Sequence, residues 1–303
     1  IYAALYLHES PDELLLSLLD QLSTDVLTLD MIDFSGPAFT RVDNRLMALR
    51  LVQQGLSKAA MFQNDGKVVQ PSDVLYKKAV LVERSRFRPP TRLTLSLLDR
   101  SYKAFCQDTG LLADDIVVLS EMTLHNLAQG DEINAQDFLD RVEILCALGK
   151  HVMISDYGEF YRLGQYLSEF TQMPIGIALG VPTLLQIFNE EYYEDLDGGI
   201  LESFGRLFKN DMRLYVCPCL DRESGELVSV HDLRVNQNLQ HLYLHLLENG
   251  YIRELQDINS RHLSIFSHDV LEKIHRGESD WTDMVPETVA NIIRDKHLFG
   301  CKD

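Results

Sequence analysis

The sequence predicts an α/β protein in which a Rossmann-like parallel sheet is preceded by a small α/β domain. Short, β-branched apolar runs such as 79–82 are typical of strands buried on both faces of a parallel sheet. From residue 79 onward these runs alternate with segments whose apolar residues recur at spacings of three and four, the pattern of amphipathic helices. Glycine and proline mark many of the boundaries between the two kinds of segment.

Length and composition are those of an ordinary globular protein. The 303 residues suffice for one large domain or for a core with an appendage, and 46% are hydrophobic and 24% charged. No run approaches the ~18 apolar residues needed to cross a bilayer. Residues 1–7 lack the basic region and cleavage site of a signal peptide. We therefore expect a cytoplasmic protein with no membrane partner; without an initial methionine, further sequence could precede residue 1.

Charge and cysteine content argue against two classes of protein. A net charge of -18 disfavours a general nucleic-acid binder, which needs an extended basic face. The five cysteines are scattered, which fits a reducing compartment and not a disulfide framework. Cys217 and Cys219 flank a proline but lack a second pair at metal-binding spacing. We interpret them as thiols at the end of a buried strand.

The first 77 residues are predicted to form the small α/β domain. Its predicted elements are a helix starting at Ser10-Pro11, a helix from about Asn44 to Gly55, and a hairpin of 59–62 with 67–69 around Asn64-Asp65-Gly66. None of these segments carries a pattern of catalytic residues. We expect this domain to serve packing or assembly, including the formation of a homo-oligomer.

Residues 78–303 are predicted to form the main domain, with a sheet of about five strands. We expect strands at 79–82, 116–119, 151–154, 175–179 and 214–216, and helices at 134–148, 162–170, 198–209, 239–248, 268–276 and 286–296. The runs 80–82, 117–119 and 175–179 should be adjacent parallel strands.

The loop after the first of these strands is rich in cations. Four arginines (Arg84, Arg86, Arg88 and Arg92) lie between the strand and a helix whose apolar face includes Leu95 and Leu98. Where a strand leads into a helix in an α/β sheet, free backbone N–H groups and the helix dipole favour phosphate. In a chain this acidic, the arginines therefore indicate an anion site. The alternative is that they pair with surface carboxylates.

Four blocks of sequence resemble one family. Ser85-x-Phe87-x-Pro89-x-Thr91-x-x-Thr94-Leu95 resembles the first-strand loop of the HxGH-type nucleotidyltransferases, which include the nicotinate/nicotinamide mononucleotide adenylyltransferases. Residues 265–274, followed by Gly277, resemble the family's I-S-S-T-x-x-R-x-x-I segment. Residues 284–299 resemble its closing V-P-x-x-V block, and 177–184 its strand ending in G-x-D-x-L. Together they extend from 79 to 299.

The resemblance implies adenylyl transfer from ATP, with Mg²⁺, to a mononucleotide in NAD biosynthesis. It implies a nucleotide or another phosphate-bearing small molecule as partner. Catalytic positions correspond to Thr91 and Thr94. Nucleotide-binding positions correspond to Ser85, Arg86, Phe87, Arg88, Arg92, Gly180, Ser267 and His268.

The chain departs from the family pattern at four positions. Thr94 replaces the second histidine, Leu271 the motif arginine, Arg88 an acidic residue and Pro182 the aspartate of G-x-D. Losing one preorganised donor typically slows a reaction ~10²–10³-fold. Arg86, Arg88, Arg92 and His268 could compensate. Two hypotheses follow: an active adenylyltransferase, or a degenerate pseudoenzyme that binds a nucleotide or serves assembly.

Other polar groups have weaker patterns. Asp156 and Glu159 follow a predicted strand, as does Glu121, and could bind Mg²⁺ or a ribose or simply cap their loops. His241 and His245 lie one helical turn apart but have no third ligand nearby.

Overall fold

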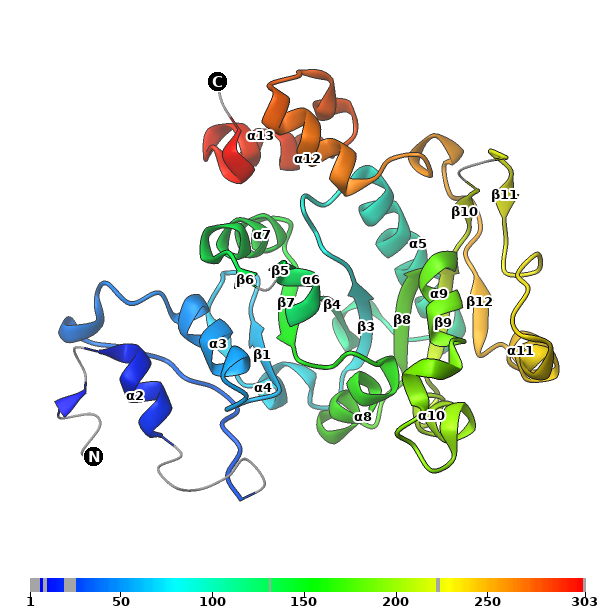
Figure 1. Ribbon diagram of the computed structural model, residues 1–303, viewed down its shortest axis with the longest axis horizontal. Coiled ribbons are helices and arrows are strands. Elements are labelled where there is room, and N and C mark those ends of the chain that lie inside the picture. Colours follow the sequence, from blue (N-terminus) through cyan, green and yellow to red (C-terminus); the bar gives the residue numbers. More distant parts are fainter. Residues whose placement is uncertain (1–5, 8–9, 19–25, 131, 222–223, 302–303) are drawn as a thin grey trace. The chain divides into compact units, whose positions relative to one another are not determined.

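The computed structural model describes residues 6–7, 10–18, 26–130, 132–221 and 224–301. It confirms the α/β class and the mostly parallel sheet (Figure 1). The chain divides into two compact units, a smaller one comprising residues up to 74 with 120–157 and a larger one comprising 75–119 with 158–303. Among the described residues, no helix combines the length and apolarity needed to cross a bilayer.

The larger unit is built on parallel strands. Their order is β12-β9-β8-β3, followed by the first part of β4. The pairs β12–β9, β9–β8 and β8–β3 are parallel, and Val80 lies opposite Ile175. The bounds are β3 Ala79–Arg84, β4 Ile116–Thr123, β8 Ile175–Gly180, β9 Arg213–Cys217 and β12 Ile252–Glu254. The expected adjacency of 80–82 with 175–179 is confirmed.

Helices alternate with these strands along the chain, and α12 and α13 follow the last strand. The bounds are α5 Arg92–Thr109, α8 Phe160–Phe170, α9 Val181–Ile187, α10 Gly199–Leu207, α11 Gln240–Glu248, α12 Ser267–Arg276 and α13 Glu287–Asp295. Helix α5 packs on β3, β8 and β9. Helix α12 ends at Gly277, whose φ of 70° is the left-handed conformation that glycine adopts at a helix C-terminus.

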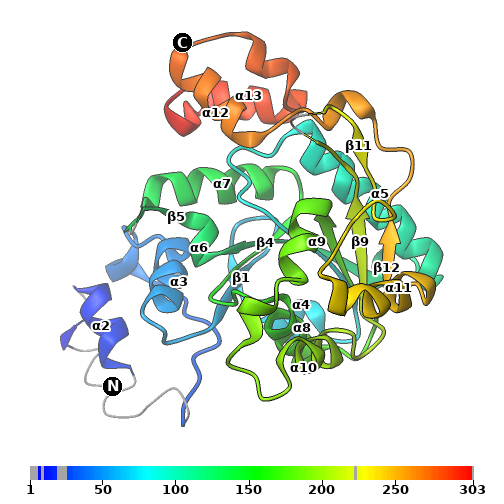
Figure 2. The same ribbon diagram turned by 45° about the vertical axis from the view of Figure 1, so that its right-hand side comes forward.

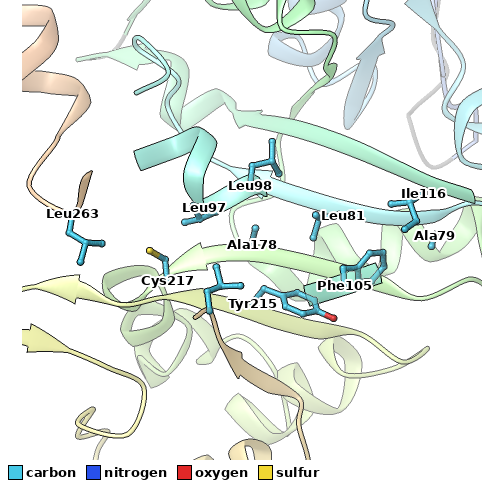
Figure 3. Packing of buried hydrophobic residues seen from close by; sticks show 11 residues of the cluster. Ala79, Leu81, Leu97, Leu98, Phe105, Ile116, Ala178, Tyr215, Cys217 and Leu263 are labelled. Carbon is cyan, nitrogen blue, oxygen red and sulfur yellow. The ribbon is translucent and has the colours of Figure 1, made fainter. Parts of the chain in front are cut away.

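The core of the larger unit lies between α5 and the strands (Figure 3). Phe105 of α5 meets Tyr215 of β9 edge to face, with ring centroids 5.9 Å apart. Gly176 of β8 lies beneath them, and a Cβ atom there would come within 3.0 Å of Leu81, Phe105 and Tyr215. The strands are buried on both faces because helices cover them, which explains their continuous apolar runs.

The smaller unit combines antiparallel strands with short helices. Strand β1 pairs antiparallel with β2, forming the predicted hairpin, and also with β7. Its main elements are α2 Pro11–Ser17, α3 Asn44–Gln53, β1 Ala59–Phe62, β2 Val68–Val69, α6 Leu124–Leu127, α7 Ala135–Ala147 and β7 His151–Ser155. The sequence predicts an apolar face of Leu14, Leu15, Leu18 and Leu19 on the first helix, and of these Leu19 lies outside the described residues.

The grouping of strand 151–155 differs from our expectation. We placed it among the parallel strands of residues 78–303. It does lie next to β4 in the sheet, but on its other side it pairs antiparallel with β1, Ala59 lying opposite Ser155. A strand's own residues do not specify its neighbour, because main-chain hydrogen bonds are the same for any partner. The contacts therefore group 120–157 with the smaller unit. The boundary at residues 77 and 78 stays a prediction.

Candidate functional site

The loop from β3 to α5 is anchored by Phe87. Its side chain is 1% exposed, and its φ of 47° is uncommon for a residue with a Cβ atom. A cis peptide bond joins Arg88 to Pro89. Arg86 is exposed, while Ser85 and Arg88 are half-buried. The loop thus buries its aromatic residue and carries arginines on either side of it.

Thr91 and Thr94 form a reciprocal capping box at the start of α5. Thr91 Oγ1 accepts from the Thr94 N–H and Thr94 Oγ1 accepts from the Thr91 N–H, each at 3.3 Å. The Arg92 N–H donates to the carbonyl of Met284 at 3.0 Å. We expected free N–H groups here, but those of Thr94 and Arg92 are bonded within the chain, to Thr91 and to Met284. Thr91 is also only 2% exposed.

Two of the four arginines bind main-chain carbonyls. Arg84 donates to the Gly158 carbonyl at 2.6 Å, and its guanidinium lies 4.3 Å from the centre of the Phe160 ring. Arg92 Nε donates to the Asp283 carbonyl at 2.7 Å. These contacts tie the loop to α8 and to the segment before α13. Both contacts use main-chain carbonyls, a role for these two arginines that we did not predict from the sequence.

Helix α12 begins beside the same loop. Ser267 Oγ donates to the Pro89 carbonyl at 3.0 Å, although 178 residues separate them in the chain. Both views show the start of α12 next to the start of α5 (Figures 1 and 2). No side chain caps α12, and the N–H groups of Ser267, His268 and Asp269 have no acceptor among the described residues. The first turn of α12 therefore offers these three donors to an anion, whereas at α5 the N–H groups of Arg92 and Thr94 are bonded within the chain.

A pocket of about 420 Å³ adjoins the start of α12. His268 lies at its edge, 2.8 Å from a carboxylate oxygen of Asp269 and stacked on Phe266 with ring centroids 5.7 Å apart. The pocket is lined by Leu220, Asp221, Gly225, Leu263, Ser264, Phe266, His268 and Asp269. It therefore combines aromatic and aliphatic surface with carboxylates.

Gly180 lies at the edge of the sheet to which the arginine loop is attached. It ends β8, and the parallel register pairs Glu83 of β3 with Ala178 of β8, so both strands finish at this edge. A Cβ atom at Gly180 would lie 3.5 Å from Pro182, an ordinary contact. Space therefore does not require glycine here.

A histidine that we did not single out from the sequence lies against α5. Nδ1 of His262 is 2.8 Å from Oγ of Ser96, 166 residues away in the chain. Burial, followed by the nearby charge of Arg92, lowers the pKa of this imidazole below its ordinary value. No local motif marks either residue, so only tertiary contact identifies the pair.

The weaker candidates bond to other side chains of the chain. Asp156 pairs with Lys58 at 2.9 Å, and Glu159 pairs with Arg162 at 3.1 Å. The buried carboxylate of Glu121 accepts from the hydroxyl of Ser155. Within the part of the chain that the structure describes, no cluster of three or more histidine, cysteine or acidic residues could hold a metal ion.

Cys217 is a buried thiol at the end of β9, as predicted. Burial, with a smaller contribution from Cys219, raises its pKa to about 12. At neutral pH it is protonated and unreactive.

In comparisons with known proteins, no family model and no curated protein matches the chain. Similar solved structures include the Plasmodium falciparum nicotinic acid mononucleotide adenylyltransferase complexed with APC, which is 11% identical to this chain. The match covers 74% of this chain and 98% of that chain, and its TM-score is 0.42. The same enzyme complexed with NaAD matches with 11% identity, the same coverage and a TM-score of 0.41. At such identities and scores, these likenesses establish neither the family nor the function of the chain.

Proposed function

We propose that the larger unit binds the phosphate groups of a nucleotide where the arginine loop meets α12, and that it transfers an adenylyl group from ATP to a mononucleotide. One observation carries this proposal: the hydrogen bond from Ser267 to Pro89 joins two segments that each resemble a nucleotidyltransferase motif. Chance similarity of two short segments would not bring them together in space.

The groups at this junction suit a polyphosphate. Arg86 and Arg88 would hold phosphoryl oxygens from the loop, while the open first turn of α12 would hold the opposite end through backbone N–H groups. In an in-line displacement at the α-phosphorus, such groups position the reactants and neutralise charge that develops on the oxygens. Proton transfer by the protein is not required.

The pocket beside α12 suits the base of the nucleotide. Its volume of about 420 Å³ falls within the usual range of ~300–1,000 Å³ for small-molecule sites. The ring of Phe266 would stack on a flat base, and the carboxylate of Asp221 would accept from an exocyclic amino group. Adenine has such a group, in agreement with ATP as the donor.

Magnesium is assigned to the substrate. No side-chain cluster among the described residues could hold a resident metal ion. The ion would enter with ATP, coordinated by the phosphate oxygens and water that Mg²⁺ prefers. The acceptor is proposed to be a pyridine mononucleotide, by the sequence resemblance alone.

A second candidate function is nucleotide binding without transfer. The capping box favours it, because Thr91 and Thr94 stand at the catalytic positions of the resemblance yet bond to each other. Leu271 offers no charge where the motif has arginine. A chain of this kind would bind ATP and serve in regulation or assembly.

Calorimetric titration with ATP, beside an assay of pyrophosphate release with ATP, Mg²⁺ and nicotinate or nicotinamide mononucleotide, tests both candidates. Turnover supports adenylyl transfer, whereas tight binding without turnover supports the second function. Arg86→Ala should weaken ATP binding about tenfold, since a charge-assisted bond contributes roughly 1.5–3 kcal/mol. Arg276→Ala, which removes an exposed arginine at the far end of α12, is the matched control. Absence of ATP binding would overturn the proposal.

A further inference from the structure

The pair formed by His262 and Ser96 adds an imidazole to the start of α5. His262 ends the short helix η5 (Ser260–His262), which packs on α5. Ser96 lies one turn beyond Arg92 on α5, so the imidazole and the guanidinium neighbour the same helical face. We propose that His262 and Arg92 form a binding site for a phosphate-type oxyanion, that Ser96 holds the imidazole in place, and that the anion binds together with a proton.

The contacts around the ring favour one tautomer of His262. Asn259 Oδ1 accepts from the Arg261 N–H at 3.1 Å, so the amide nitrogen of Asn259 is turned toward His262. That nitrogen lies 3.5 Å from Nε2, a long contact in which Nε2 is the acceptor. This arrangement favours the tautomer in which Nδ1, 2.8 Å from Oγ of Ser96, carries the proton of the neutral ring. Nε2 is left as the position where a second proton can be added.

The electrostatic surroundings disfavour protonation of Nε2 when no anion is bound. Burial and then the charge of Arg92 lower the pKa of His262, and no carboxylate among the described residues offsets them. From α5 the ring contacts Ser96 and lies near the charge of Arg92, and from its own segment it contacts Asn259. An oxyanion with two negative charges, placed between guanidinium and imidazolium, would remove this repulsion.

Arg92 retains donors for such an anion. Its Nε donates to Asp283, while its terminal nitrogens have no hydrogen-bond or ion-pair partner among the residues that the structure describes. The guanidinium is therefore fixed through one nitrogen and can bind an oxyanion through the others.

The proposed site at His262 and Arg92 adjoins the proposed nucleotide site. Arg92 directly follows Thr91, and Ser267 binds the same loop at Pro89. The inference rests on the proposed function in this respect, because the oxyanion would be one phosphate group of the same ligand. Proton uptake by His262 adds a property that the function alone does not imply: phosphate affinity that rises as the pH falls.

Sulfate is a suitable probe because its charge stays constant between pH 5 and 8.5. Ring-proton NMR of His262, assigned with the His262→Gln variant, would be recorded over this range at fixed ionic strength. We expect sulfate to raise the midpoint of His262 by about one pH unit, and therefore to bind about tenfold more tightly at low than at high pH. His262→Gln should abolish this pH dependence. Ser96→Ala should reduce it while sulfate still binds at low pH.

His241→Gln, an exposed histidine on α11, is the control and should leave the sulfate titration unchanged. The inference is overturned if sulfate leaves the His262 midpoint unchanged, or if the pH dependence survives in His262→Gln. ATP binding that does not perturb His262 would overturn this site and leave the proposed function intact. Sulfate binding at His262 without any affinity for ATP would support the site and overturn the proposed function.

Discussion

Removal of the Thr91 hydroxyl separates a structural from a catalytic role for the capping box. Thr91→Val keeps the volume of a side chain that is 2% exposed, so it leaves no cavity. It removes the acceptor of the Thr94 N–H and leaves that group without its bond. Losing an N-cap costs about 1 kcal/mol, and an unsatisfied buried donor costs about 1–3 kcal/mol.

We therefore expect Thr91→Val to lower the free energy of unfolding by about 2 kcal/mol. For a folded unit of roughly 150–250 residues, about 2 kcal/mol lowers Tm by roughly 4–8 °C. Urea unfolding followed by circular dichroism measures the loss. Thr94→Val should destabilise less, because Thr94 is half-buried whereas Thr91 is buried.

The double variant tests whether the two threonines act as one unit. In a reciprocal box, Thr91→Val with Thr94→Val should cost less than the sum of the single changes, because either change disrupts the same pair. The reasoning is refuted if Thr91→Val keeps full stability but loses ATP affinity or turnover. That result would place the Thr91 hydroxyl on the ligand instead of on the helix.

Four other changes have defined outcomes. Arg88→Ala should weaken ATP or sulfate binding by roughly ten- to a hundredfold in calorimetry, less at high salt, whereas a fall in Tm with unchanged affinity would contradict a phosphate contact. Gly176→Ala should cost about 1–3 kcal/mol in urea unfolding, because its Cβ would come within 3.0 Å of three side chains of the core in Figure 3. Burial lowers the pKa of His151, so the folded state binds this proton less readily than the unfolded state does. The free energy of unfolding is therefore higher above about pH 6.5 and decreases as the pH falls below that value. This decrease should be smaller in the His151→Gln variant. Cys217, with its pKa of about 12, should resist alkylation at pH 8 in the folded chain and react only on unfolding; rapid labelling of the native protein would contradict its burial.

Much of the fold could be predicted because its signals are local. The runs 79–82 and 175–179 are apolar and β-branched, and they form neighbouring parallel strands. The turn at Asn64-Asp65-Gly66 joins β1 to β2, because Gly66 adopts the positive φ that this turn requires. For such elements, each residue's own conformational preference already agrees with the fold.

The bond from Ser267 to Pro89 brings together two segments that each resemble a motif of the same family. The sequence could not indicate how the groups at this junction are used. A threonine that resembles a catalytic residue is equally suited to cap a helix. The spacing of Thr91 and Thr94 in the sequence fits a catalytic motif and a capping box alike. The choice depends on backbone angles and burial, which tertiary packing determines.

Contacts between distant segments were decided only by the tertiary structure. The antiparallel pairing of β7 with β1 could not be read from residues 151–155, since main-chain hydrogen bonds carry no side-chain identity. The pairing of His262 with Ser96 depends on where η5 packs on α5, a position set by the burial of apolar residues such as Leu263 in the core. Local preferences determined the strands and helices of this protein, and packing determined which polar groups meet.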